Sequence, residues 1–231
     1  MDGAAAHLPA HRLLRERTRA AHDAAEATAG MQALMSGAMD DAGYAELLAA
    51  QRRLFREWEG ERAAAIAAIA TVWPYESRIP ALDNDIAAPG GVLAGATLGA
   101  ITGPETATDP VAPCEKMSRA GRAPTGGCGV DAGGGDDAAA EVVAVFWGEL
   151  YVIEGSALGG QVIVRHLRQR FPARPHHYYG LGEHAPGRWR RFQDALDRAL
   201  PDTASQQLAL AGAQRMFARF QRTLQDPGHH V

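Results

Sequence analysis

One histidine near the amino terminus has neighbours that suit a metal ligand. His22 lies in the stretch LRERTRAAHDAAE, with Glu26 one helical turn after it and Arg15 two turns before it on nearly the same face. A neutral imidazole is a good iron ligand, and its second ring nitrogen needs an acceptor that fixes the tautomer. We expect Glu26 to act on that nitrogen directly or through water, and Arg15 to pair with an anionic group. A lone helical histidine is more often a surface or core residue, so that interpretation stays open here.

A second stretch, EGSALGGQ over residues 154–161, is unusual because it places glycines inside a helical pattern. Each interior glycine costs about 0.5–1 kcal/mol relative to alanine. Gly155 and Gly159 are four residues apart and share a face. Such a face lets a flat group approach the helix backbone, or it lets a bulky neighbouring helix pack closely. The residues alone favour neither of these interpretations.

Both stretches belong to segments with the apolar period of helices, and the sequence contains no strand hairpin signal, so we expect an all-α protein. A stripe running from Tyr44 through Gln51 to Trp58 repeats at three- and four-residue steps, and Asp40 or Asp41 is a suitable N-cap. The expected helices cover about residues 9–29, from 41 onward, 61–71, 78–88, 138–171, 188–200 and 205–224. Residues 175–186 are expected to form a turn-rich segment.

Residues from about 89 to 135 differ from the rest, because they contain 12 of the 26 glycines and 5 of the 13 prolines. Such a composition buries too little apolar surface to offset the entropy of ordering. We interpret it as an insertion within a single domain that covers residues 1–231. Cys114 and Cys128 lie in it without a nearby histidine, and we expect both to be free thiols.

Composition and charge argue against several classes of protein. The net charge is −4, so a nucleic-acid binder held by a positive field is not expected. No apolar run approaches the roughly 18 residues of a membrane span, and residues 1–19 lack the apolar segment of a secretory signal. Alanine supplies 47 of the 231 residues and arginine 22 of the 23 basic ones, and both favour helices. We therefore expect a cytoplasmic, helix-rich domain without a membrane or nucleic-acid partner.

Two of these stretches, in this order, resemble motifs of the haem oxygenases. LRERTRAAHDAAE resembles the proximal-helix motif of that family, and LYVIEGSALGGQVI resembles its glycine-rich distal-helix motif. The segment HYYGLGEHAPGRWRRFQDAL resembles the region that follows in the bacterial, biliverdin-producing branch associated with bacteriophytochromes. The resemblance covers nearly the whole chain except the insertion. It implies a single-domain helical fold with haem between a proximal and a distal helix.

The resemblance also implies a role for individual residues. His22 matches the proximal iron ligand, Glu26 its supporting carboxylate, and Arg15 a basic position that helps to hold a haem propionate. Arg190 or Arg191 falls near the second basic cluster for propionates. The distal glycines match Gly155, Gly159 and Gly160. Tyr151 and Phe220 are candidates for the haem pocket, although a core position is the better expectation for both.

One departure from the family pattern concerns the distal helix. Many relatives carry an aspartate one residue after the first distal glycine, where this chain has Ser156. The serine is usual in the bacteriophytochrome-associated branch, but it leaves the proton-delivery groups undefined. Ser156, Glu154, Gln161 and ordered water are the candidates, and Glu154 could instead point to solvent.

The resemblance implies an enzyme that binds haem as substrate and cofactor and opens its ring with dioxygen. The products would be biliverdin, carbon monoxide and ferrous iron. Electrons would come from an external donor of the ferredoxin or flavodoxin-type reductase systems, and a bacteriophytochrome is a candidate recipient of the biliverdin. Two alternatives remain: a haem carrier or sensor without turnover, and a helical interaction module that has lost haem binding.

Overall fold

A computed structural model describes residues 8–88, 134–183 and 187–225, and these residues contain helices and no strands, which confirms the all-α prediction. The elements run in the order α1 (Ala10–Arg17), α2 (Arg19–Glu26), α3 (Ala29–Ser36), α4 (Asp41–Ile69), α5 (Ile79–Ala87), α6 (Gly134–Arg170), α7 (His177–Gly180), the 3-10 helix η1 (Leu181–Glu183), α8 (Arg188–Ala199) and α9 (Thr203–Gln225).

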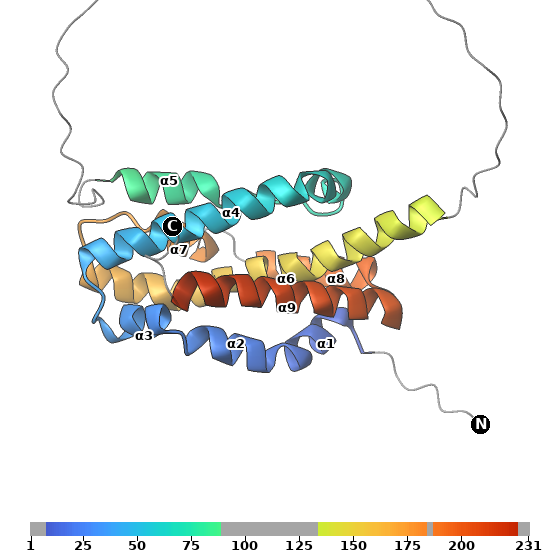
Figure 1. Cartoon of the computed structure of the whole chain (residues 1–231), viewed down its shortest axis with the longest axis horizontal. Coiled ribbons are helices and arrows are strands. Elements are labelled where there is room, and N and C mark those ends of the chain that lie inside the picture. Colours follow the sequence, from blue (N-terminus) through green and yellow to red (C-terminus); the bar gives the residue numbers. More distant parts are fainter. Residues whose placement is uncertain (1–7, 89–133, 184–186, 226–231) are drawn as a thin grey trace, which may run out of the picture.

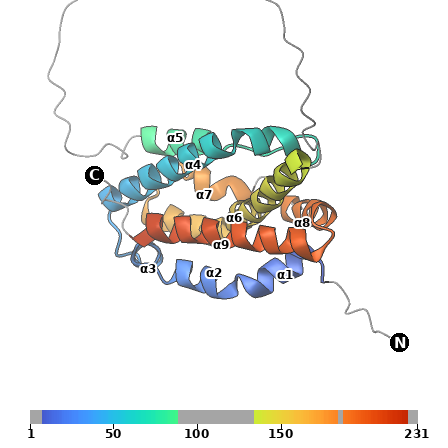
Figure 2. The same cartoon turned by 45° about the vertical axis from the view of Figure 1, so that its right-hand side comes forward.

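These helices stack in three layers. Figures 1 and 2 show α6 and α9 in the middle layer, with α4 and α5 on one side and α1, α2 and α3 on the other. The closest association is between α6 and α9, while α1, α2 and α3 all pack on α9. A single cluster of buried apolar side chains connects the layers, including the fully buried Trp58, Phe146 and Phe192. The middle layer therefore supports both outer layers.

The amino-terminal segment is not the single helix that we expected over 9–29. It breaks at Thr18, whose φ of −103° and ψ of 1° separate α1 from α2. The Thr18 hydroxyl donates a hydrogen bond to the Leu14 carbonyl at 2.7 Å, and the Thr18 amide donates to the same carbonyl at 2.9 Å. A threonine hydroxyl bonded in this way often bends a helix. The separate helix α3, which we did not predict, ends at Gly37 with a φ of 75°.

Helix α4 confirms the apolar stripe and extends it. Asp40 is the N-cap, and its carboxylate accepts a hydrogen bond from the Gly43 amide at 2.8 Å. The helix continues without interruption to Ile69, so the expected alanine-rich helix over 61–71 is its last part. No proline lies within these residues to stop the helix before the turn that precedes Trp73 and Pro74.

Helix α6 is the central helix, as predicted, but it begins at Gly134 rather than Ala138. The remainder of the expected insertion, residues 89–133 with both cysteines, lies outside the described residues. Helices α6 and α9 touch through their backbones, because a Cβ on Gly148 would lie 1.7 Å from the Ala209 carbonyl oxygen. By length and composition, α6 alone among the described helices could cross a membrane, and its most apolar stretch is 56% buried inside this fold.

The carboxyl-terminal third agrees with the prediction in outline. The helices α8 and α9 match the expected 188–200 and 205–224 to within two residues. The turn-rich segment contains two short helical pieces, α7 and η1, which the sequence did not indicate. His176 and His177 point apart, because His176 is buried with a φ of 55° and His177 is exposed.

Candidate active site

A cavity of about 810 Å³ opens between α2 and α6, and α9 forms its floor. This volume lies near the upper end of the range for small-molecule sites, so the cavity suits a large ligand. Nine of the thirteen candidate site residues named from the sequence line it, namely Arg15, His22, Glu26, Tyr151, Gly155, Ser156, Gly159, Gly160 and Phe220. The two expected motifs therefore meet across one space, although they are more than 120 residues apart in the chain.

The imidazole of His22 lies on the α2 wall of the cavity and is 56% exposed. Its ring packs edge-on against Phe217 of α9, with centroids 6.1 Å apart. The Nε2 atom lies 3.7 Å from a Glu26 carboxylate oxygen, and Nδ1 lies 3.7 Å from Asp23. Both distances exceed a direct hydrogen bond. Either carboxylate can therefore support the ring after a small rotation or through water.

The other end of the cavity is bounded by Arg15, Thr18 and Tyr151, which bring the α1–α2 junction against α6. Burial raises the pKa of the Tyr151 hydroxyl, while the Arg15 charge and a hydrogen bond with Thr18 act in the opposite direction. Tyr151 is both a buried residue and a cavity residue, so the two interpretations offered by the sequence are compatible. Phe220 of α9 likewise combines burial with a place in the cavity wall.

The three distal glycines have three different surroundings. A Cβ on Gly160 would lie 2.8 Å from the Tyr179 carbonyl oxygen, so this glycine is needed for packing against α7. A Cβ on Gly155 would lie 3.3 Å from the Trp189 ring, whereas one on Gly159 would meet nothing within 4 Å. The sequence left open whether these glycines admit a flat ligand or a closely packed helix, and the structure shows a different answer for different glycines. Gly160 serves helix packing, and Gly159 leaves open space at the cavity.

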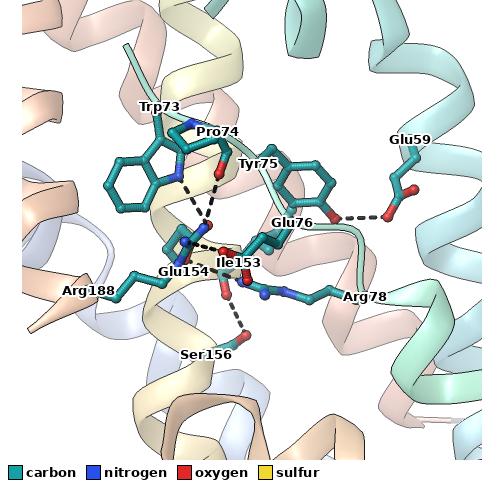
Figure 3. Close-up of polar contacts among 10 residues, drawn as sticks. All are labelled: Glu59, Trp73, Pro74, Tyr75, Glu76, Arg78, Ile153, Glu154, Ser156 and Arg188. Atoms are coloured by element: carbon teal, nitrogen blue, oxygen red, sulfur yellow. Dashed lines mark hydrogen bonds and ion pairs between the residues drawn. The ribbon is translucent and has the colours of Figure 1, made fainter. Parts of the chain in front are cut away.

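The residues beside Gly155 do not behave as the sequence suggested. The Ser156 hydroxyl donates to the Ile153 carbonyl at 2.7 Å within its own helix (Figure 3). Glu154 does not point to solvent: it is 3% exposed and does not line the large cavity. The expectation that it could face solvent was wrong, because three partners hold its carboxylate in the interior.

Those partners of Glu154 come from outside α6 (Figure 3). The Arg188 guanidinium donates two hydrogen bonds to it at 2.8 and 2.9 Å, and the Trp73 indole donates one at 3.1 Å. A third group, the Arg78 guanidinium, forms an ion pair at 3.3 Å. Burial by itself raises the pKa of Glu154, but Arg188, Arg78 and Trp73 outweigh burial and hold the pKa below its usual value.

Arg190 and Arg191 are exposed on α8 and do not line the cavity. The same helix instead contributes Trp189 and Gln193 to the wall. These two are four residues apart and share one face of α8, whereas Arg190 and Arg191 lie to the side. The segment near 190 is therefore at the site, but the cavity-facing residues are the neighbours of the predicted arginines.

The inner wall of the cavity contains polar residues that the sequence reasoning missed: Gln51, Arg78, Tyr178 and Tyr179. Burial raises the pKa of both tyrosines well above the ordinary value, so their hydroxyls stay protonated. Gln51 donates a hydrogen bond to the Tyr179 hydroxyl at 2.8 Å. One signal was present in the sequence, since Gln51 is a polar residue within the apolar stripe of α4.

The cavity fits a haem in three respects. It supplies one imidazole on its α2 wall, a backbone open at Gly159 on the opposite wall, and a guanidinium at its end from Arg15. A histidine is a common protein ligand of haem iron, and arginine pairs well with carboxylates such as propionates. The chemistry of the donor set therefore agrees with the resemblance.

Comparison with known proteins gives one informative match. A protein named haem oxygenase from Xanthomonas campestris pv. campestris (strain 8004) is 34% identical to this chain over 197 residues. The match covers 84% of this chain and 96% of the relative. No protein-family model and no solved structure matches the chain. Similarity at this level over nearly the full length of the relative places the chain in the haem oxygenase family, a family of haem-degrading enzymes.

Proposed function

We propose that this protein binds haem between α2 and α6 through His22 and converts it to biliverdin, carbon monoxide and ferrous iron. The observation that carries the proposal is the meeting of His22 and the distal glycines across one cavity of about 810 Å³. When bound, the haem supplies the iron centre that reacts with dioxygen, and an external donor supplies the electrons. The rest of the mechanism concerns what the chain itself does.

The α2 wall holds and orients the ligand. The neutral His22 imidazole offers one ring nitrogen to the iron, and the other nitrogen donates its proton to a carboxylate. Glu26 lies 3.7 Å from Nε2 and Asp23 lies 3.7 Å from Nδ1, so Asp23 would fix the tautomer if Nε2 binds the iron, and Glu26 if Nδ1 does. A carboxylate partner increases the electron density of the ligating nitrogen.

The cavity end near Arg15 selects the orientation of the ligand in its plane. The Arg15 guanidinium would pair with a carboxylate substituent of the haem. The positive charge of Arg15 also acts on the nearby Tyr151 hydroxyl, which stays protonated at neutral pH because burial raises its pKa. A charge-assisted hydrogen bond of this kind is stronger than a neutral one and restricts rotation of the ring. The position of Arg15 would thus help to fix how the ligand is rotated within its own plane between α2 and α6.

The α6 wall limits what approaches the iron-bound side. Gly159 leaves room for a flat ring to reach the helix backbone, while Gly155 is covered by the Trp189 ring. Neither glycine adds an acid–base side chain to the α6 wall of the cavity. Reaction at the ring edge is favoured where no such side chain promotes rapid cleavage of the oxygen–oxygen bond.

The remaining parts of the proposal follow the family resemblance. The electron donor is a ferredoxin or flavodoxin-type reductase system, and the biliverdin passes to a bacteriophytochrome. Burial of the apolar stretch of α6 supports its role as a core helix. The cytoplasmic location is part of the same proposal. Ferredoxin and flavodoxin can each be tested as the donor by adding the purified protein with its reductase.

The binding part of the proposal is tested by titrating the haem-free protein with haemin and following the Soret absorption. We expect one haemin per chain for the wild type and for His177→Ala, a control that removes an exposed histidine outside the cavity. His22→Ala should lose the spectrum of a histidine-ligated haem. An unchanged spectrum in His22→Ala would show that another residue ligates the iron.

The catalytic part is tested by adding a reductant and oxygen to the haemin complex. The Soret band should disappear as biliverdin absorption grows, and chromatography of the product identifies its isomer. If haemin binds through His22 but the Soret band survives, the protein is a haem carrier or sensor. If no Soret shift appears at all, haem binding itself is absent.

A further inference from the structure

A tyrosine and a histidine are hydrogen-bonded to each other in the interior of the protein. Tyr44 on α4 is fully buried, and His176, the residue before α7, is 1% exposed. The Tyr44 hydroxyl oxygen lies 2.9 Å from His176 Nδ1, and His176 Nε2 lies 2.9 Å from the Phe171 carbonyl oxygen. Neither residue of the pair lines the large cavity, and the proposed function uses neither.

These contacts determine which ring nitrogen of His176 carries the proton. A backbone carbonyl only accepts hydrogen bonds, so Nε2 must donate to Phe171. The neutral ring then has Nδ1 as its acceptor, and the Tyr44 hydroxyl donates to it. Burial lowers the pKa of His176 and raises that of Tyr44, so both side chains are neutral at pH 7. The pair is therefore a phenol whose proton already points at a base.

Charged side chains around the pair make a proton transfer to His176 reversible. The Asp85 carboxylate on α5 favours a positive charge on His176, whereas the Arg168 and Arg174 guanidiniums oppose it. The Arg174 guanidinium also lies 5.4 Å from the centre of the Tyr44 ring. With two opposing charges and one supporting charge, a proton moved to His176 returns readily to Tyr44.

A row of tyrosine rings connects the pair to the large cavity. Tyr178 and Tyr179 of α7 line the cavity, and their ring centroids are 4.9 Å apart. The Tyr179 ring lies 6.5 Å from the Tyr44 ring and at 27° to it. Electrons pass between aromatic rings at such short separations. The row thus leads from the cavity wall to a tyrosine that does not line the cavity.

The tyrosines of this row differ in what their hydroxyls contact. A phenol that loses an electron becomes a strong acid, so it is oxidised more easily where a base takes its proton. Tyr179 bonds the side-chain amide of Gln51 at 2.8 Å, and an amide is a very weak base. Tyr44 instead bonds an imidazole, which accepts protons readily. An oxidising equivalent that enters the row is therefore most stable at Tyr44.

We propose that Tyr44 and His176 form a redox-active pair, which receives oxidising equivalents from the large cavity through Tyr179. The inference rests on the proposed function for its oxidant, which is bound haem that hydrogen peroxide has oxidised without attack on the ring. Hydrogen peroxide is the two-electron reduction product of dioxygen. The pair draws the oxidation away from the cavity wall and so protects the side chains there.

One electron moves at each step of this transfer. The oxidant takes one electron from Tyr179, and Tyr44 then gives one electron to Tyr179. The hydroxyl proton of Tyr44 moves to Nδ1 of His176, which leaves a neutral tyrosyl radical beside an imidazolium. One electron from the external donor and the return of the same proton restore Tyr44 and neutral His176.

The first test uses the haem-free protein and needs no turnover. A ruthenium(II) polypyridyl complex, flashed with light in the presence of persulfate, supplies a one-electron oxidant. Electron paramagnetic resonance of the frozen sample should show a tyrosyl radical in the wild type, and Tyr44→Phe should lose most of that signal. Tyr75→Phe is the matched control and should keep the signal, because Tyr75 also donates at 2.9 Å, to Glu59, and lies outside the cavity wall (Figure 3). A full signal in Tyr44→Phe would overturn the proposal.

The second test separates proton acceptance from structure. His176→Asn suits the φ of 55° at this position, and its amide oxygen can still accept from Tyr44. Because an amide does not take up the proton, this variant should lose most of the radical although it folds. The wild-type radical should also show a hyperfine coupling to one exchangeable proton, from Nδ1, that deuterium oxide removes. A wild-type yield and coupling in His176→Asn would rule out His176 as the proton acceptor.

The third test connects the pair to the haem site. Hydrogen peroxide added to the haemin complex should give the same radical in the wild type. In Tyr44→Phe, mass spectrometry should find more oxidation of Trp189 and Met31, which line the cavity. Equal oxidation of these residues in both proteins would refute the protective role. If the protein binds no haemin, the proposed function fails, whereas the ruthenium experiment still tests the pair.

Discussion

The two walls of the cavity are built in opposite ways. Helix α2 has eight residues, none of which is buried, and it rests on α9. Helix α6 has 37 residues and supplies a large share of the core, and Glu154 ties it to Arg78, Arg188 and Trp73. The difference suggests a division of labour. The α2 wall can adjust to the ligand, while the α6 wall keeps a fixed shape against which the ligand is held.

The strongest test of the contrast is to remove the one side chain of α2 that would bind iron. His22→Ala should reduce turnover by more than about 100-fold, since loss of a ligand exceeds the effect of losing its supporting carboxylate. The free energy of unfolding of the haem-free protein should change by less than about 0.5 kcal/mol, because the ring is 56% exposed. Chemical denaturation and single-turnover absorbance measure the two quantities. A large loss of stability would mean that α2 is not the adjustable wall.

The corresponding change on the α6 side should act on stability. Glu154→Leu leaves Arg78 and Arg188 without their buried partner and should cost about 3–5 kcal/mol of unfolding free energy. Wild-type stability should also fall with acid, because the pKa of Glu154 is lower in the folded protein than in the unfolded chain. The contribution is complete above the unfolded value of about 4.3 and is lost as the pH falls through the folded pKa.

Urea melts at several pH values check both statements, with Glu61→Leu as a control. Glu61 pairs with Arg219 at the surface, where its side chain is 45% exposed. The control should lose less than about 1 kcal/mol. The difference in unfolding free energy between wild type and Glu154→Leu should become smaller in acid. A constant difference from pH 7 to pH 3 would contradict the lowered pKa of Glu154 in the folded protein.

Two adjacent glycines of α6 sharpen the comparison within one wall. Gly160→Ala places a Cβ 2.8 Å from the Tyr179 carbonyl oxygen and should destabilise the protein by about 1–3 kcal/mol. Gly159→Ala meets nothing within 4 Å and should stabilise the haem-free protein by about 0.5–1 kcal/mol. The same Gly159→Ala change should weaken haemin binding, because its methyl group enters the cavity. Thermal melts and haemin titrations of the two variants measure these effects. Similar melting temperatures for the two variants would refute the predicted difference in stability.

The smallest expected effect concerns the charges around the cavity. Arg15→Met should weaken haemin binding about fivefold, roughly 1 kcal/mol, since a partly exposed ion pair contributes little more. Arg191→Met should leave the affinity unchanged, because Arg191 does not line the cavity. Haemin titrations at low and high salt measure both. A greater loss for Arg191 would restore the original assignment from the sequence resemblance.

The sequence predicted most of the fold because helix periods are local. The stripe of α4, the central α6 and the two closing helices all follow from residues within a few turns of each other. The break at Thr18 was missed because it depends on one hydroxyl bonding to Leu14, and threonine also occurs inside regular helices. The short α7 was missed because four residues carry too little pattern.

The candidate site was predicted where its residues lie in contiguous motifs. His22, Glu26 and the glycines were found for that reason, and the structure brings them to one cavity. Gln51 and Arg78 come from two further elements, and only the tertiary arrangement shows that they share a wall with the motifs. For Arg190 and Arg191 the resemblance located the right segment but the wrong residues. A shift of one residue along a helix turns the side chain by about 100°, so a small error in alignment moves it off the cavity.

The backbone contact between α6 and α9 has a consequence for how this chain can evolve. Gly148 meets Ala209, and Gly212 meets the Val145 carbonyl, so neither helix can slide past the other without a collision. This close contact at Gly148 and Gly212 lies between the start of α6 and the cavity residues of α6, which begin at Tyr151. A change of length between residues 88 and 134 acts on the start of α6, which the contact at Gly148 separates from the cavity residues. We therefore expect a change of length in that stretch to leave the geometry of the cavity unchanged.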